Sequence, residues 1–278
     1  MSNGLQKFIL TIFILILAGT AQSFGQGNNP LVPVNTGTPF YIGPVIGYNR
    51  VLHSAELQTF ESAVPCPVFE NGSANGYFFG ISMEYLLGGP KNSTQSIIAR
   101  LLYNSMPASF EVVGDEYPSV LTDNQGNQTE VLSSTNHINE VTYDMISLDV
   151  QYKFNFVETF GVIVGPTFDF ALTKDQEQLF QLVTPENARF EQKPDSEFEY
   201  SDDGRTLIAA SGEIPNSSAF RAGIKFGVQY ELILNNGMYI VPNFNYNYGI
   251  TNLSADDDWR VSALQFGVDI RFPSTSIF

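Results

Sequence analysis

The sequence is poor in cysteine, in basic residues and, after residue 30, in long apolar runs. Its single cysteine, Cys66, has no partner within the chain, so no internal disulfide can hold the fold together. Lys and Arg total 13 against 29 Asp and Glu, and the net charge of −16 argues against nucleic acid as a partner. No uninterrupted apolar stretch near about 18 residues follows residue 30, which excludes a transmembrane helix in that part of the chain.

The N-terminal segment has the organisation of a secretory signal peptide. One cation, Lys7, precedes the apolar run FILTIFILILAG, and the small residues Ser23 and Gly25 follow it. This order predicts that residues 1–25 are removed during export. The apolar run is too short to favour a retained membrane anchor. We expect residues 26–39 to form a short periplasmic segment and residues 40–278 to form the folded domain.

Alternation of apolar and polar residues predicts strands with two different faces. In RAGIKFGVQYEL, residues 221–232, every even position is apolar, whereas Arg221, Lys225 and Glu231 occupy odd positions. Aromatic residues make up 13% of the chain and charged residues only 15%, which is low for a water-soluble domain. Each predicted strand supplies the roughly 9–11 residues that a transmembrane β-strand needs. The predicted strands are 40–54, 75–88, 95–114, 130–156, 160–173, 218–234, 238–253 and 259–272.

One face of these strands is aromatic and apolar, and the other carries the charges. Eight strands enclose a space that side chains only just fill, and the aromatic rows are too bulky for it. We therefore predict that the aromatic face contacts lipid and that the charged face lines the interior, where charges must pair if they are buried. The predicted lumen ion-pair network has five acids and five bases: Glu84, Arg100, Asp149, Lys153, Asp169, Arg221, Lys225, Glu231, Asp269 and Arg271.

Connections between the predicted strands alternate in length. GGPKNST, VETF and NNG form short links, whereas the links at 55–74, around DNQGN at 123–127, and at 174–217 are long. Outer-membrane barrels have short periplasmic turns and longer external loops. The sequence thus predicts an all-β fold: an eight-stranded antiparallel up-and-down transmembrane β-barrel with long extracellular loops and short periplasmic turns.

Three prolines conflict with continuous strands. Pro44, Pro166 and Pro242 lie inside predicted strands, and each removes one backbone donor from the ladder. A closed barrel has no free edge on which to place them. We therefore expect bulges or strand ends at these points.

The end of the last predicted strand resembles a family signal. QFGVDIRF, residues 265–272, is similar to the C-terminal recognition signal of bacterial outer-membrane barrels, although PSTSIF follows it. The resemblance implies that the barrel-assembly machinery reads Gln265, Gly267, Ile270 and Phe272. With WRVSALQFGVDIRF and NSSAFRAGIKFGVQYEL, the chain from about 40 to 272 resembles the small barrel of OmpA-type proteins, particularly the barrel domains of Bacteroidota. Many members of that family continue into a periplasmic peptidoglycan-binding domain, whereas this sequence stops at the barrel.

The predicted external loops hold the excess negative charge. The link 174–217 contains ten acidic residues against four basic ones, and FEYSDDGRTLIAA within it is typical of a hairpin that turns at Asp202–Gly204. Such a loop suits divalent cations that bridge lipopolysaccharide phosphates, or a basic protein partner; a solvated, repulsive surface is the simpler interpretation. Asp256–Asp258 lacks the spacing of a calcium-binding loop, so no metal site is predicted. Trp259 is expected at the membrane interface.

The leading hypothesis is a barrel of the bacterial outer membrane with a structural and surface-interaction role, without cofactor or enzymatic chemistry. Its expected partners are outer-membrane lipid, lipopolysaccharide, the assembly machinery and an external protein at 174–217. A narrow, low-conductance pore is the alternative, because several wall glycines leave space for a thin water path. An enzyme at the rim would need His53 or His137 beside an exposed serine and a carboxylate. Cys66, between two prolines, is expected to be an unreacted loop cysteine.

Overall fold

The computed structural model describes most of the chain after residue 38, and almost all of that part is antiparallel β-structure. The predicted signal peptide, residues 26–38 and Cys66 lie outside the described residues. In the part of the chain that the structure describes, no helix is long and apolar enough to cross a membrane. The described ranges are 39–58, 68–88, 93–122, 125–157, 159–191, 198–234, 237–255 and 258–274.

Twelve strands belong to one sheet. The long strands match the alternating segments of the sequence, because a residue pattern of period two buries one face of a strand and exposes the other. The strands are β1 (Phe40–Gln58), β2 (Val68–Leu87), β3 (Gln95–Ser105), β4 (Ala108–Thr122), β5 (Gln128–Val157), β6 (Phe160–Thr184), β7 (Glu199–Ser201), β8 (Thr206–Glu213), β9 (Phe220–Tyr230), β10 (Leu232–Ile233), β11 (Tyr239–Gly249) and β12 (Arg260–Pro273).

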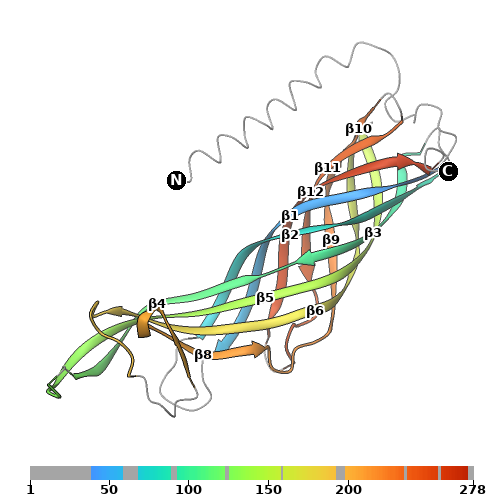
Figure 1. Cartoon of the computed structure of the whole chain (residues 1–278). Helices are drawn as coiled ribbons and strands as arrows, with labels where there is room; N and C mark the ends of the chain where they lie inside the picture. The colour runs from blue at the N-terminus through green and yellow to red at the C-terminus, as the bar shows by residue number, and fades with distance from the viewer. Residues whose placement is uncertain are drawn as a thin grey trace.

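Eight of these strands close into a barrel (Figure 1). The ring order is β1–β2–β3–β5–β6–β9–β11–β12, and β12 pairs back with β1, so that every neighbouring pair is antiparallel. Tyr48, for example, lies opposite Phe266 of β12 on one side and opposite Tyr77 of β2 on the other. The predicted eight-stranded antiparallel up-and-down barrel is confirmed.

The two faces of the wall are arranged as the sequence predicts. Phe226, Phe244 and Phe266 point outward and are 49%, 37% and 54% exposed, whereas Lys225 and Asp269 are 2% and 0% exposed inside the barrel. A water-soluble β protein has the opposite arrangement, with its aromatic face buried and its charged face wet. The barrel is therefore apolar outside and largely polar inside.

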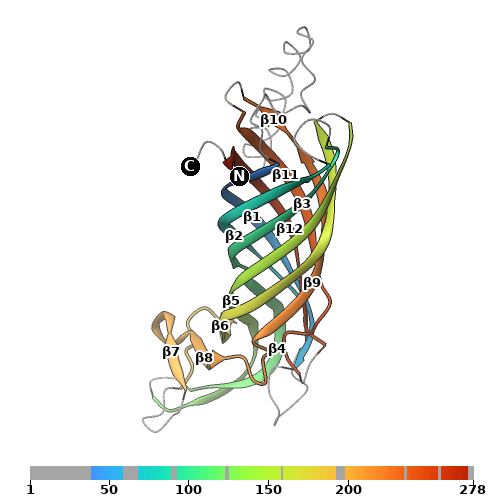
Figure 2. The same cartoon turned by 90° about the vertical axis from the view of Figure 1, so that its right-hand side faces the viewer.

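The two ends of the barrel differ in their connections. One end, which we call the terminal end, carries the start of β1, the end of β12 and the short links between β2 and β3, β5 and β6, and β9 and β11 (Figures 1 and 2). The other end, which we call the loop end, carries the longer links. Much of what the sequence predicts as long loop is strand here, because β1, β2, β5 and β6 all continue past the ring.

A sheet extension projects from the loop end, and we call it the distal lobe. It consists of β4, residues 128–141 of β5, residues 175–184 of β6, β7 and β8. The predicted strand 95–114 is divided at Met106–Pro107 into β3 and β4. β3 pairs with both β2 and β5, whereas β4 leaves the ring and pairs with β5. The hairpin predicted at Asp202–Gly204 is confirmed between β7 and β8, and Asp202 and Asp203 both adopt positive φ. Figure 2 shows β7 and β8 at the edge of the lobe.

The expectation of bulges or strand ends at the prolines is wrong for Pro44 and Pro166. Each lies within a continuous strand, and the pairing has the same offset on both sides of it. Pro242 lies within β11, which is continuous. The strand that pairs with it is interrupted between β9 and β10, but β10 pairs with β11 in the same register as β9 does. One missing donor is thus tolerated because the pairs before and after it hold the register.

Glycines explain why two of the prolines fit. Gly43 and Gly165 immediately precede Pro44 and Pro166, and a Cβ on either glycine would lie 1.8 Å or 2.0 Å from a carbonyl oxygen of the neighbouring strand. Any side chain would push that strand away. The glycines therefore allow the close approach of strands beside the missing donors.

Candidate functional site

The structure places all ten residues of the predicted lumen network inside the barrel, and all ten are buried. They come from six strands, and each sits on the inward parity of its strand, or one residue past the end of β9 in the case of Glu231. Each of the ten has at least one oppositely charged partner within the set. The sequence pattern gave the members of this network, and the structure gives the pairing.

Six of the ten charges gather around Asp269 and Lys153 toward the terminal end. Asp269 accepts hydrogen bonds from Nη2 of Arg100 at 3.0 Å and from Nη2 of Arg271 at 2.6 Å. Arg271 also pairs with Glu84. The Lys153 ammonium lies between two carboxylates, those of Glu84 and Glu231. The chain Arg100–Asp269–Arg271–Glu84–Lys153–Glu231 therefore crosses the lumen with alternating sign.

The remaining charges form two separate pairs. Arg221 of β9 pairs with Asp169, its direct cross-strand neighbour on β6. Lys225, also on β9, reaches past β6 to Asp149 of β5. Because isolated buried charges are very unfavourable, whereas paired and hydrogen-bonded ones are tolerated, this pairing is a condition for the barrel to close.

Amides connect the charged layer with the loop end. Gln265 donates to Asn49 Oδ1 at 2.8 Å, Asn49 donates to Asn104 Oδ1 at 2.7 Å, and Asn104 donates to Ser147 Oγ at 3.2 Å. All four residues are buried. Sequence reasoning missed this ladder because it considered charged residues only, although the same inward parity identifies these amides.

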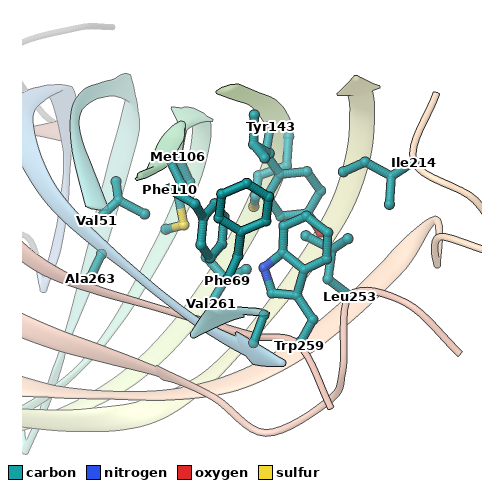
Figure 3. Packing of buried hydrophobic residues seen from close by; sticks show 14 residues of the cluster. Val51, Phe69, Met106, Phe110, Tyr143, Ile214, Leu253, Trp259, Val261 and Ala263 are labelled. Carbon is teal, nitrogen blue, oxygen red and sulfur yellow. The ribbon is translucent and has the colours of Figure 1, made fainter. Parts of the chain in front are cut away.

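An apolar cluster fills the barrel at the loop end, and we call it the plug (Figure 3). Sequence reasoning missed it as well. Its signal is a change of residue type at constant parity: near the loop end, the inward positions hold apolar side chains such as Val51, Tyr143 and Val261. The buried members of the plug are Val51, Ala55, Phe69, Met106, Ala108, Phe110, Val141, Tyr143, Met145, Ile214, Leu253, Trp259, Val261 and Ala263.

The expectation that Trp259 lies at the membrane interface is wrong. Trp259 is 1% exposed inside the plug, and its Nε1–H donates to Nδ1 of His53 at 3.0 Å. Nε2 of His53 faces the carbonyl oxygen of Met106 at 3.1 Å. Because Nδ1 accepts a hydrogen bond, the ring proton is assigned to Nε2, which donates to Met106. The indole edge finds a partner inside the barrel, which is why it can be buried there.

The two histidines occupy different surroundings. Both ring nitrogens of His53 are engaged within the plug, and Phe110 and Trp259 pack around the ring. His137 lies in the distal lobe, where its Nε2 is 3.2 Å from Thr135 Oγ1 and its ring lies edge-on to Phe180 at 4.2 Å. Within the described ranges, no three His, Cys, Asp or Glu side chains converge in a way that would hold a metal ion.

The structure also shows where the four residues that resemble an assembly signal lie. Gln265 is buried in the amide ladder, and Gly267 faces Phe78, whose ring Cζ would lie 2.9 Å from a Cβ at that position. Phe78 is itself buried in the lumen. Ile270 and Phe272 lie on the outward parity of β12. The internal packing alone thus requires a polar residue and a glycine at the first two positions.

The predicted acidic turn at 256–258 is described only at its last residue. Asp258 pairs with Arg260 at 3.2 Å, and both side chains are exposed. Asp256 and Asp257 lie outside the described residues.

No family model matches the sequence, and no curated protein matches it. Among solved structures, the chain is similar to Neisserial surface protein A, at 14% identity and a TM-score of 0.35, covering 84% of this chain and 98% of that one. It is also similar to Ail, the attachment invasion locus protein of Yersinia pestis, at 12% identity and a TM-score of 0.32, covering 84% of this chain and 99% of that one. A third similar structure is the outer membrane protease OmpT from Escherichia coli, at 8% identity and a TM-score of 0.32, covering 84% of this chain and 95% of that one. At these identities and scores the matches carry no argument about function, and the fold rests on the strand pairing.

Removing the central carboxylate of the network should destabilise the barrel. Asp269→Ala leaves Arg100 and Arg271 short of a buried partner, so we expect the free energy of unfolding to fall by about 3–5 kcal/mol. Denaturant titration in micelles, followed by the fluorescence of the single tryptophan, measures it. Asp203→Asn is the matched control, because asparagine tolerates the positive φ of residue 203 and the change removes only an exposed charge. The Asp203–Arg189 pair, at 3.2 Å, is 90% and 42% exposed and should matter little. Equal effects of the two variants would contradict the internal network.

Truncating the centre of the plug should also be costly. Trp259→Ala leaves a cavity and an unsatisfied His53 acceptor, and we expect a loss of about 3–5 kcal/mol in unfolding free energy. Circular dichroism during denaturant titration follows this variant, which has no tryptophan. Leu132→Ala, at a residue 59% exposed on the lobe, should change little. A tolerated Trp259→Ala would mean that the indole does not pack as described.

Proposed function

We propose that this protein is an integral β-barrel of the bacterial outer membrane, with a closed lumen and a distal lobe that serves surface interactions. The observation that carries the proposal is the inversion of the wall: a closed antiparallel ring with aromatic and aliphatic side chains outside and paired charges inside. Only helices and closed barrels satisfy all backbone hydrogen bonds within lipid. A ring without edges and with an apolar exterior suits that solvent.

The location follows from the export signal together with the ring. Residues 1–25 have the composition of a signal peptide, and barrels of this kind occur in outer membranes. With the terminal end in the periplasm, the short links lie on the periplasmic side and the distal lobe lies outside the cell. The resemblance of residues 265–272 to an assembly signal agrees with insertion by the barrel-assembly machinery, with Gln265, Gly267, Ile270 and Phe272 in that role.

The interior argues against the narrow-pore alternative. A continuous water path would have to cross the plug and then the alternating charges around Asp269 and Lys153. An eight-stranded ring leaves a space that side chains fill. The closed interior supports a rigid anchor.

The interior also argues against chemistry at His53. Both of its ring nitrogens are engaged by Trp259 and Met106, so neither is available to take a proton from a serine. We propose that the protein is not an enzyme.

The charge of the distal lobe supports a basic external partner. The basic side chains that the structure describes between residues 174 and 217 are already engaged: Arg189 pairs with Asp203, Lys174 pairs with Glu213, and Arg205 donates to backbone carbonyls. The lobe also carries exposed acidic side chains, so it presents negative charge to the exterior. They include Glu111, Glu116, Glu130, Glu186, Glu191 and Glu199. The residues 174–217, proposed in the sequence as the partner-binding segment, form a large part of this lobe. Lipopolysaccharide and outer-membrane lipid would contact the wall itself.

Quenching by brominated phospholipids tests which face of the wall meets lipid. In a Trp259→Phe background, Phe244→Trp places the only indole on the outward face, and we expect strong quenching after insertion into vesicles. Leu132→Trp, in the same background, places it on the lobe and should be quenched little. The wild-type Trp259, buried in the plug, should also be shielded. Quenching of Leu132→Trp but not Phe244→Trp would overturn the membrane assignment.

Planar-bilayer recording tests the closed interior. The wild-type chain should give no stepwise current above that of a protein-free bilayer, because the plug and the ion pairs fill the lumen. The Phe244→Trp variant in the Trp259→Phe background, prepared and inserted in the same way, must show strong quenching, which establishes that the procedure inserts the protein. Reproducible small steps from inserted protein would instead support the narrow pore.

A further inference from the structure

The distal lobe contains a cavity that the proposed anchoring role does not use. It has a volume of about 580 Å³ and lies between the β4–β5 hairpin on one side and β6, β8 and residues 185–191 on the other. Pockets that hold drug-sized molecules span roughly 300–1,000 Å³. The cavity is therefore of a size that suits a small organic molecule.

One wall of the cavity is a strip of small polar side chains. Ser133, Thr135 and His137 occupy successive inward positions of β5 and are all buried, and Ser119 of β4 lies beside them. Ser133 and Ser119 hydroxyls are 2.5 Å apart, and Thr135 contacts His137. A hydroxyl can both donate and accept, so this strip can receive either kind of polar group from a ligand.

The opposite walls are apolar and aromatic. Phe180 of β6 packs edge-on against His137, and Leu207 of β8 and Phe190 close the far side. At the mouth, Val120 and Phe198 are 57% and 48% exposed. Apolar surface of this kind gains free energy when a ligand removes it from water.

Few charged side chains line the cavity, and one of them already has an ion-pair partner. Arg189 lines it but pairs with Asp203, and Glu191 is the only acidic residue among the described lining residues. A charged ligand would find no buried counter-charge here. The lining thus favours a neutral molecule.

We propose that the distal lobe binds a neutral, mainly apolar ring compound that carries one or two hydrogen-bonding groups. The ring would lie against Phe180 and Leu207, and its polar group would meet the strip formed by Ser119, Ser133 and Thr135. This inference goes beyond the anchoring role, and the lining residues lie outside the barrel ring. It stands or falls separately from the membrane assignment.

Calorimetric titration of the full-length chain in amphipol with 2-naphthol, a neutral ring compound with one hydroxyl, tests the proposal. We expect saturable binding at one site per chain. Ser133→Phe fills the cavity from β5 and should weaken the affinity by at least about tenfold. Ser134→Phe is the matched control: it makes the same change at the adjacent residue, which faces away from the cavity, and it should bind as the wild type does.

A second variant covers the case in which Ser133→Phe misfolds. Ala188→Phe fills the cavity from the 185–191 segment, which is not part of a strand, and should weaken binding to the same degree. The quenching and conductance measurements report on the barrel and do not depend on this site. Absence of saturable binding to the wild-type chain, or equal binding by the folded cavity-filling variants, would overturn the proposal.

Discussion

Mutual neutralisation of charge inside a narrow cylinder is the constraint on which the rest of the structure depends. A ring of eight strands has little internal space, and the outward surface is committed to aromatic and aliphatic residues. Every charged group of the inner face must then find its counter-charge inside the lumen. Arg271 shows how tightly this is arranged, because its guanidinium pairs with carboxylates from two places, Glu84 on β2 and Asp269 on its own strand. Strand register, ring closure and side-chain pairing therefore depend on one another.

The lumen has two zones that solve this problem in different ways. Toward the terminal end, charges of alternating sign satisfy one another. Toward the loop end, the plug avoids the problem with apolar side chains, and its one polar contact chain, from Trp259 through His53 to Met106, is fully satisfied. The amide ladder from Gln265 to Ser147 lies between the zones. The lumen is thus graded along its length from ionic to amide to apolar groups.

The sequence predicts the ring well because a period of two has a direct meaning in a strand. The outward position of Phe266 and the inward position of Lys225 follow from parity alone. What the sequence cannot give is distance across the lumen: Lys225 pairs with Asp149 two strands away, which no local pattern encodes. Trp259 was misplaced for the same reason, since its partner His53 is far away in the chain. The prolines were misjudged because the expectation treated each strand alone, whereas pairs on both sides hold the register.

The distal lobe was the least predictable part, because charged and polar loops and solvated strands have similar composition. β5 illustrates its consequence. It runs without interruption for 30 residues, a contour of about 100 Å, while the bilayer core is only about 30 Å thick. Even with the tilt of a barrel strand, this stiff ladder stands well clear of the lipid headgroups. A molecule that binds the far end of this strand need not touch the bilayer. The fold therefore holds a binding surface at a distance from the membrane in addition to anchoring the protein in it.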